Sequence, residues 1–257
     1  MSDYSIAKHF DQYFQIQFAN TKELRQEAFK IRYGVYSHEL GWEPENALEM
    51  ETDEYDDYSY HCLLKHRRTG VFAGCVRLVI PPVYEPNLQL PFEQNCLSSA
   101  KKEIIDSTQL PRGSFGEISR LAVLSSFRRR EREKDKPFTI NDMNPKTVFT
   151  EDEQRNFPNI AIGLYLAAVA LADICNHQRM FVMMEPRLNR YLSRIGLQFQ
   201  QVGDPMEYHG KRAMFHLARG GYSSNLTPEL KELYDIISKE LLGQLFLVPF
   251  CNSADRL

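Results

Sequence analysis

Charged side chains within apolar segments are the residues of this sequence that most directly suggest chemistry. Glu117 and Arg120 occur in the segment GEISRLAVL, whose other residues are mostly apolar. A charged group that faces a protein core requires a partner or a function, because burying an unpaired charge is costly. Residues three apart along a strand lie on opposite faces, so these two side chains meet only if a bulge interrupts the strand. The alternative is an edge strand whose charges face solvent.

A second group of charges is the acidic run METDEYDDY at residues 50–58. Its carboxylates at Glu51, Asp53 and Asp56 are close enough in sequence to bind a hard cation or an ammonium group. A solvated acidic loop is the plainer alternative. Arg77 lies in the apolar segment GCVRLV and stays charged, so it requires a carboxylate, and the acidic run supplies candidates. A structural ion pair would satisfy this requirement without any catalytic role.

A basic run begins with Arg128, Arg129 and Arg130 and carries six positive and three negative charges over residues 128–136. Such a run docks an acidic partner or binds phosphate, or it is simply solvated surface. It opens a charged stretch with little periodicity, residues 128–158, which we interpret as a long insertion or a lid.

The elements that must position these groups follow from hydrophobic periodicity and from capping and turn residues. Helices are expected over residues 20–40, with a capping box formed by Asn20 and Glu23, over 159–175 and 186–196, and in the C-terminal helix and tail, 226–257. Strands are expected over residues 60–65, 71–80, 116–124, 180–184, 198–202 and 213–218. A hairpin meander that passes into a βαβ crossover predicts an α+β fold with a mixed sheet. No change in composition marks a boundary, so residues 1–257 are expected to form a single domain.

Composition excludes several classes of protein. The 257 residues are 43% hydrophobic and carry a net charge of -3, which argues against disorder and against a global basic field for nucleic acid. The five cysteines are odd in number and form no CxxC pair, so a reducing compartment is expected. The longest apolar run, residues 160–172, is too short to span a bilayer, and the N-terminus has no apolar signal-peptide core. These features predict a soluble, cytoplasmic protein without stable membrane insertion.

No HExxH motif, P-loop, Gly-x-Ser-x-Gly turn or dinucleotide-binding fingerprint occurs in the sequence. The histidines are scattered and the cysteines have no obvious partner histidine. No metal site and no permanently bound cofactor are therefore predicted.

Taken together, the charged residues resemble a known pattern. The acyl-homoserine-lactone synthase family has an Arg, an aromatic residue four later, a Trp, an E-x-D-x-x-D run, a strand Arg, a Phe and an E-x-S-R strand. The residues here that match this pattern are Arg32, Tyr36, Trp42, Glu51, Asp53, Asp56, Arg77, Phe92, Glu117, Ser119 and Arg120. The second half of the chain, with IAIGLYLAAVALA, MEPRLNRYLSRIG and EYHGKRAMF, looks like the back half of the GCN5-related N-acetyltransferase (GNAT) fold. In detail it is most similar to the acyltransferases associated with PEP-CTERM/exosortase systems, which resemble long-chain N-acyl amino acid synthases.

This resemblance implies a GNAT-like acyltransferase fold with a central mixed, V-splayed β-sheet flanked by helices. It implies an enzyme that moves a long-chain acyl group from an acyl carrier protein thioester to the amine of an amino acid or related small molecule. Glu117 and Asp53 would be catalytic, and the residues that would bind substrate are Arg32, Trp42, Glu51, Asp56, Arg77, Phe92 and Arg120. The alternatives are an acyl-homoserine-lactone synthase that uses S-adenosylmethionine and a non-catalytic acyl-binding regulatory module.

Two departures from the pattern bear on the donor and the pocket. Tyr36 stands where the family commonly has Phe. The glycine-rich turn that grips the pyrophosphate of coenzyme A in ordinary GNAT enzymes is missing, because Phe127 leads into Arg128, Arg129 and Arg130. A backbone nest for pyrophosphate needs the conformational freedom of glycine. The departure favours acyl-phosphopantetheine on an acyl carrier protein over acyl-CoA, with these arginines as the surface that binds donor and carrier protein.

Overall fold

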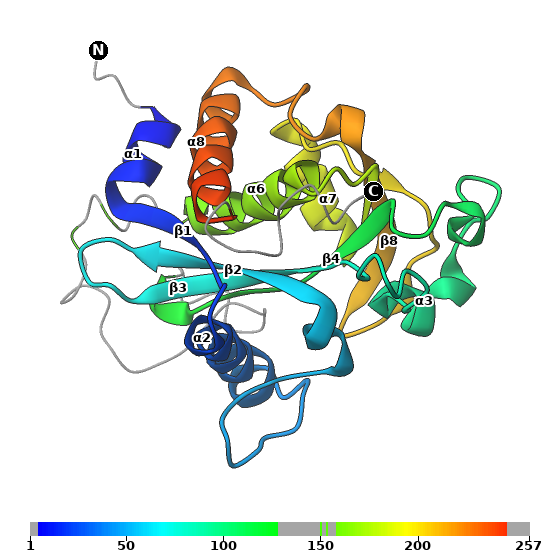
Figure 1. Ribbon diagram of the computed structural model, residues 1–257, viewed down its shortest axis with the longest axis horizontal. Helices are drawn as coiled ribbons and strands as arrows, with labels where there is room; N and C mark the ends of the chain where they lie inside the picture. The colour runs from blue at the N-terminus through cyan, green and yellow to red at the C-terminus, as the bar shows by residue number, and fades with distance from the viewer. Residues whose placement is uncertain (1–4, 128–149, 151–152, 154–157, 246–257) are drawn as a thin grey trace.

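The computed structural model describes residues 5–127, 150, 153 and 158–245. It contains a mixed sheet in the order β1-β2-β3-β4-β5-β8-β6, with β7 paired to β8 (Figure 1). The strands are β1 (Phe14–Phe18), β2 (Ser59–His66), β3 (Phe72–Val79), β4 (Phe115–Val123), β5 (Arg179–Met184), β6 (Gln200–Gln201), β7 (Met206–Glu207) and β8 (Lys211–Ala218). The first four strands form an antiparallel meander, β4 and β5 are parallel, and β5 and β8 are antiparallel. The mixed sheet predicted from the sequence is therefore confirmed.

Helices cover both faces of the sheet. On one face lie α1 (Ile6–Tyr13), α6 (Pro158–Ile174), α7 (Pro186–Arg194) and α8 (Pro228–Leu245), and on the other lie α2 (Lys22–Arg32) and the short α3 (Pro91–Asn95) (Figure 1). The helix α6 is apolar on all sides and almost wholly buried, as expected for a helix at the centre of a core. Within the described part of the chain, no helix is long and apolar enough to cross a membrane.

The meander is built from residues that suit it. In β3, every residue after Phe72 is buried, which is typical of a central strand packed on both faces. The turn between β2 and β3 ends at Gly70, whose φ of 74° lies in the left-handed region that glycine adopts without steric cost. Arg77 is therefore carried deep into the molecule by a strand that is apolar elsewhere.

The sheet opens between β4 and β5. Their parallel ladder joins residues 115–118 to residues 179–182 and then stops, although β4 continues to Val123 and β5 to Met184. Backbone groups beyond Ile118 and Val182 are thus released from the ladder. This opening, which we call the splay, is the V shape expected from the resemblance.

A bulge interrupts β4 on the other side. Cys75 pairs with Ala122 but Arg77 pairs with Ser119, so β4 holds one residue more than β3 over this interval. The extra residue is accommodated at Arg120, whose φ of 49° is unusual for a residue with a side chain. The bulge brings Arg120 onto the face of the sheet that carries α2. Glu117 and Arg120 therefore lie on the same face, as is required for the two side chains to meet.

Some elements differ from the sequence predictions. The helix α1 and strand β1 were not predicted, since eight and five residues give little periodicity. The N-cap of α2 is Thr21, whose hydroxyl accepts from Leu24 N–H, so the Asn20 capping box is wrong. Past Arg32 the chain continues as a π-helical segment, Tyr33–Glu39, close to the predicted end. Most of the charged stretch 128–158 and the tail beyond Leu245 lie outside the described residues.

Candidate active site

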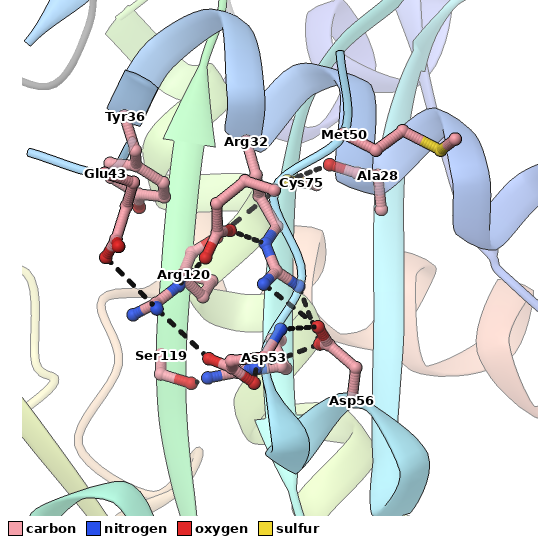
Figure 2. A network of polar contacts seen from close by, with 12 residues as sticks. Ala28, Arg32, Tyr36, Glu43, Met50, Asp53, Asp56, Cys75, Ser119 and Arg120 are labelled. Atoms are coloured by element: carbon pink, nitrogen blue, oxygen red, sulfur yellow. Dashed lines mark hydrogen bonds and ion pairs between the residues drawn. The ribbon is translucent and has the colours of Figure 1, made fainter. Parts of the chain in front are cut away.

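Three arginines and three carboxylates converge on the α2 face of the sheet (Figure 2). Arg32, the last residue of α2, is fully buried. Its Nη1 and Nη2 donate to Asp56 Oδ1 and Oδ2 at 2.7 and 3.1 Å, and its Nε donates to Glu51. Such a two-pronged bond to a carboxylate fixes the orientation of both groups.

Arg77 and Arg120 join the same network from β3 and β4. Arg77 Nη1 lies 2.5 Å from Asp53 Oδ1 and 2.9 Å from Asp56 Oδ1. Arg120 Nε lies 3.1 Å from Glu51 Oε1, and its Nη2 lies 3.0 Å from Asp53 Oδ2. The prediction that the acidic run supplies a partner for Arg77 is confirmed. Glu51 and Asp56 are only 5% and 4% exposed, so the alternative interpretation of this run as a solvated acidic loop is wrong.

The acidic run is shaped locally by its own spacing. Asp53 is the N-cap of a 3-10 helix, Glu54–Tyr58, and its side chain accepts from Tyr55 N–H at 3.0 Å. Asp56 accepts from Asp53 N–H at 2.9 Å and completes a capping box. The same two carboxylates thus cap the helix and bind the arginines, which orders the whole loop.

The charges of the network stabilise one another. Burial alone would raise the pKa of Asp56, but Arg32 and Arg77 outweigh it and hold that pKa well below its usual range. Burial alone would lower the pKa of Arg32, but Glu51 and Asp56 outweigh it and the pKa lies above its usual range. Both Arg32 and Asp56 are therefore charged. One donor is left over, because the buried Nη2 of Arg77 has no hydrogen-bond partner among the residues that the structure describes.

Glu117 lies beside this network in a different environment. It occupies β4 between Val79 of β3 and Phe181 of β5, one residue before the β4–β5 ladder ends. Its side chain is in the interior, with 2% of the residue exposed, and its Oε2 accepts from the backbone N–H of Phe92 at 2.7 Å. Burial raises the pKa of Glu117 to about 8, against the opposing effects of the Phe92 N–H, Arg77 and Arg120. The edge-strand alternative is wrong, because β4 is central.

Phe92 forms the wall next to Glu117. It follows Pro91 at the start of α3 and is 1% exposed. Its ring packs on Phe181 with centroids 4.6 Å apart. The bond from Phe92 N–H occupies one of the two carboxylate oxygens of Glu117 and fixes this side chain against the start of α3.

Trp42 is placed by an aromatic stack that crosses from the α2 side to the β7–β8 turn. Its ring lies 5.9 Å from Tyr36 and 5.0 Å from His209, nearly parallel to both. The hydroxyl of Tyr36 donates to the carbonyl oxygen of Leu121 at 2.7 Å, next to the bulge. Phe could not make this bond, which gives a structural reason for the departure at Tyr36.

Further residues of the site were given no role by the sequence analysis. Ser119, which was named there only as part of the family pattern, accepts from Arg77 Nε at 3.0 Å, and Glu43 lies 3.4 Å from Arg120 Nη2. His61, 1% exposed, lies behind Asp56 with Nε2 3.5 Å from Oδ1. The signal available for Ser119 and His61 was their position opposite Arg77 in the strand register. Arg128, Arg129 and Arg130 lie outside the described residues, so the site is described without them.

The thiols near the site are poor nucleophiles. Burial raises the pKa of Cys96 to about 11 and the pKa of Cys75 to about 12. Across the described residues, no group of three or more His, Cys, Asp or Glu side chains is arranged to hold a metal ion. The site therefore offers three features. They are the buried carboxyl of Glu117, whose pKa is raised, the network of arginines and carboxylates, which we call the cradle, and the backbone groups released at the splay.

Known proteins are similar to parts of this chain in sequence and in fold. A family model for the acetyltransferase (GNAT) domain matches residues 31–134, which include the whole network and Glu117. Acyl-homoserine-lactone synthases of Vibrio anguillarum and Aeromonas hydrophila are 34% and 28% identical over 95 and 111 residues. These stretches cover 37% and 40% of this chain and 44% and 53% of the relatives, so the chain spans about half the length of the curated relatives it matches.

Solved structures match a larger share of the chain. TofI in a ternary complex with an inhibitor and MTA superposes with a TM-score of 0.56 at 18% identity, covering 85% of this chain and 96% of TofI. FeeM, an N-acyl amino acid synthase from uncultured soil microbes, superposes with a TM-score of 0.53 at 12% identity, covering 84% and 97%. The fold is thus the GNAT-like acyltransferase fold, as the sequence predicts.

Proposed function

We propose that the protein is an N-acyltransferase that moves a long-chain acyl group from a carrier-bound thioester to the amine of an amino acid or related small molecule. The observation that carries this proposal is Glu117, an interior carboxyl with a raised pKa at the point where β4 and β5 part. A base whose pKa lies near the working pH combines enough of the reactive form with enough basicity. The GNAT family model and the acyltransferases with this fold support the class of reaction.

The chemistry needs few groups. The acceptor's ammonium group first releases one proton to solvent, which gives the neutral amine. The amine nitrogen attacks the thioester carbonyl, backbone N–H groups released at the splay donate to the oxyanion, and the ionised carboxylate of Glu117 accepts the second proton from the nitrogen, directly or through a water. When the carbon–sulfur bond breaks, the proton on Glu117 returns to the departing thiolate, so the carboxylate is regenerated. The buried, protonated thiols take no part.

The cradle would hold the acceptor. Arg32, Arg77 and Arg120 keep Asp53 and Glu51 rigid beside Glu117, and Asp53 is the more accessible carboxylate, with 20% of its side chain exposed. We assign Asp53 the role of orienting the ammonium group on its way to Glu117, and Trp42 and Phe92 the apolar walls. The catalytic role that the sequence predicts for Asp53 would consist of orienting the ammonium group in this way.

An acyl carrier protein is the proposed donor. The sequence lacks the glycine-rich turn whose backbone N–H groups would bind a pyrophosphate, and Arg128, Arg129 and Arg130 stand there instead. Their positive charge matches the acidic surface of a carrier protein. MesI, a neighbour described as a CoA-dependent acyl-homoserine lactone synthase, has the same fold, with a TM-score of 0.54. Fold alone therefore does not choose the donor. Both donor and free amino acids occur in the cytoplasm, where we place the protein.

An acyl-homoserine-lactone synthase that uses S-adenosylmethionine is the second candidate. Both curated relatives carry this name, and the first is 34% identical over its matched stretch. The resemblance of the second half to PEP-CTERM/exosortase-associated acyltransferases favours the amino acid instead.

Incubation with matched donors and acceptors separates the candidates. The purified protein is given one acyl chain on acyl carrier protein or on coenzyme A, together with amino acids or S-adenosylmethionine, and products are identified by mass spectrometry. An N-acyl amino acid made chiefly from the carrier protein supports the first proposal. An acylated lactone supports the second, and no turnover with any pair would leave only an acyl-binding module.

A further inference from the structure

A fourth arginine faces the site from the opposite arm of the splay. Arg212 lies in β8, one residue beyond the Met184–Ala213 pair that ends the β5–β8 ladder. Its guanidinium carbon lies 5.2 Å from the centroid of Trp42, over the ring. Alternation along β8 puts Arg212 on the same face as Met214, whose side chain belongs to the apolar cluster around Phe92.

Arg212 differs from the other arginines of the site in its partners. Arg32, Arg77 and Arg120 are each bound to two or more carboxylates. Among the residues that the structure describes, no carboxylate lies within ion-pair distance of Arg212, and its buried Nε has no hydrogen-bond partner. A buried donor on a charged group is costly to leave unpaired.

Arg212 and Glu117 both lie close enough to Cys96 and Tyr208 for their charges to act on them. Cys96 follows α3, and Tyr208 lies in the β7–β8 turn, so these two side chains come from opposite sides of the splay. A small molecule bound there would have Glu117 at one end and Arg212 at the other.

We propose that Arg212 binds the carboxylate of the acceptor, so that the substrate is an α-amino acid whose amine points to Glu117. A planar guanidinium stacked on an aromatic ring keeps its N–H edge free, and that edge matches a carboxylate with two parallel bonds. This inference rests on the proposed acyl transfer. It holds for a simple amino acid and for S-adenosylmethionine alike, because both carry an α-amino carboxylate, and it excludes amines that lack one.

Binding can be measured without turnover. Trp42 is the chain's single tryptophan, so its fluorescence reports a ligand at Arg212. The common amino acids and S-adenosylmethionine are titrated into the wild type, and the best amino acid is compared with its α-carboxamide. The same titrations are made with Arg212→Met, with Arg212→Lys and with Lys211→Met, an exposed cation next to it in β8 that serves as the matched control.

We expect the wild type to bind the acid roughly 10–100-fold more tightly than the amide, since a hydrogen-bonded charge pair is lost in the amide. Arg212→Met should remove this preference and raise the acceptor KM by the same factor, with the donor KM and the melting temperature unchanged. Arg212→Lys should retain part of the preference, and Lys211→Met all of it.

Equal weakening of acid and amide by Arg212→Met would overturn the inference, as would a rise in the donor KM alone, which would assign Arg212 to the donor's phosphate. If Arg212→Met does not fold, the comparison of acid with amide in Arg212→Lys decides. A wild type that discriminates acid from amide but transfers no acyl group would uphold the inference and refute the proposed function. Efficient acylation of acid and amide alike would refute the inference about Arg212 and uphold the proposed function.

Discussion

Glu117→Gln tests the proposed base most sharply, because the raised pKa predicts how activity depends on pH. With a pKa of about 8, Glu117 is mostly protonated at pH 6, and its ionised fraction rises about tenfold per pH unit until the pKa is reached. The kcat/KM of the wild type should follow that rise and level off above pH 8. Gln can still accept the Phe92 N–H bond but cannot take a proton. We expect kcat to fall roughly 10²–10⁴-fold, with the rise near pH 8 lost.

The same pKa predicts a change in stability with a defined sign. Because the pKa of folded Glu117 lies above its usual value of 4.5, its contribution to stability is complete below pH 4.5 and is lost as the pH rises through about 8. At about 1.4 kcal/mol per pH unit, the loss amounts to about 3–5 kcal/mol. Urea unfolding at pH 5, 7 and 9 should show Glu117→Gln gaining on the wild type by that order. Near-normal turnover of the variant would remove Glu117 from the mechanism, and a stability difference independent of pH would contradict its burial in a neutral form.

The other predictions concern the cradle and the donor. Asp56→Asn should cost about 3–5 kcal/mol of unfolding free energy, because it leaves Arg32 and Arg77 short of a buried partner, and the loss should shrink in acid as the wild-type carboxylate, whose pKa is lowered, becomes protonated. Asp53→Ala should abolish activity with a smaller fall in melting temperature, and restoration of chelator-treated enzyme by a divalent metal would show that the cluster binds metal instead. Arg128→Glu with Arg129→Glu should raise the donor KM steeply and make it less sensitive to salt, whereas equal efficiency with acyl carrier protein and coenzyme A would contradict the donor assignment.

The sequence predicted the parts of the site that depend on charge alone. Arg77 in an apolar strand required a carboxylate, and Asp53 and Asp56 meet it. Glu117 in a similar strand required a reason for its burial, and its place at the splay supplies one. Helices α6, α7 and α8 were found because proline, apolar periodicity and capping residues agree at their starts.

Other features arise only in the folded chain. The bulge at Arg120 puts a residue with a side chain at positive φ, and nothing local favours that. Contacts with Glu51 and Asp53, together with the Tyr36 bond to Leu121, hold it there. Arg212 was not identified from the sequence either. Its guanidinium lies over the ring of Trp42, which is 170 residues earlier in the chain, and no local pattern shows such a contact.

The most direct test of acyl transfer through Glu117 is mass spectrometry of lipid extracts from cells that express the wild type or Glu117→Gln at matched levels. We predict an N-acyl amino acid with a long acyl chain in the wild-type extract and its near absence with the variant. An extract in which the wild type produces no acylated amine, or in which Glu117→Gln produces as much as the wild type, would contradict the account.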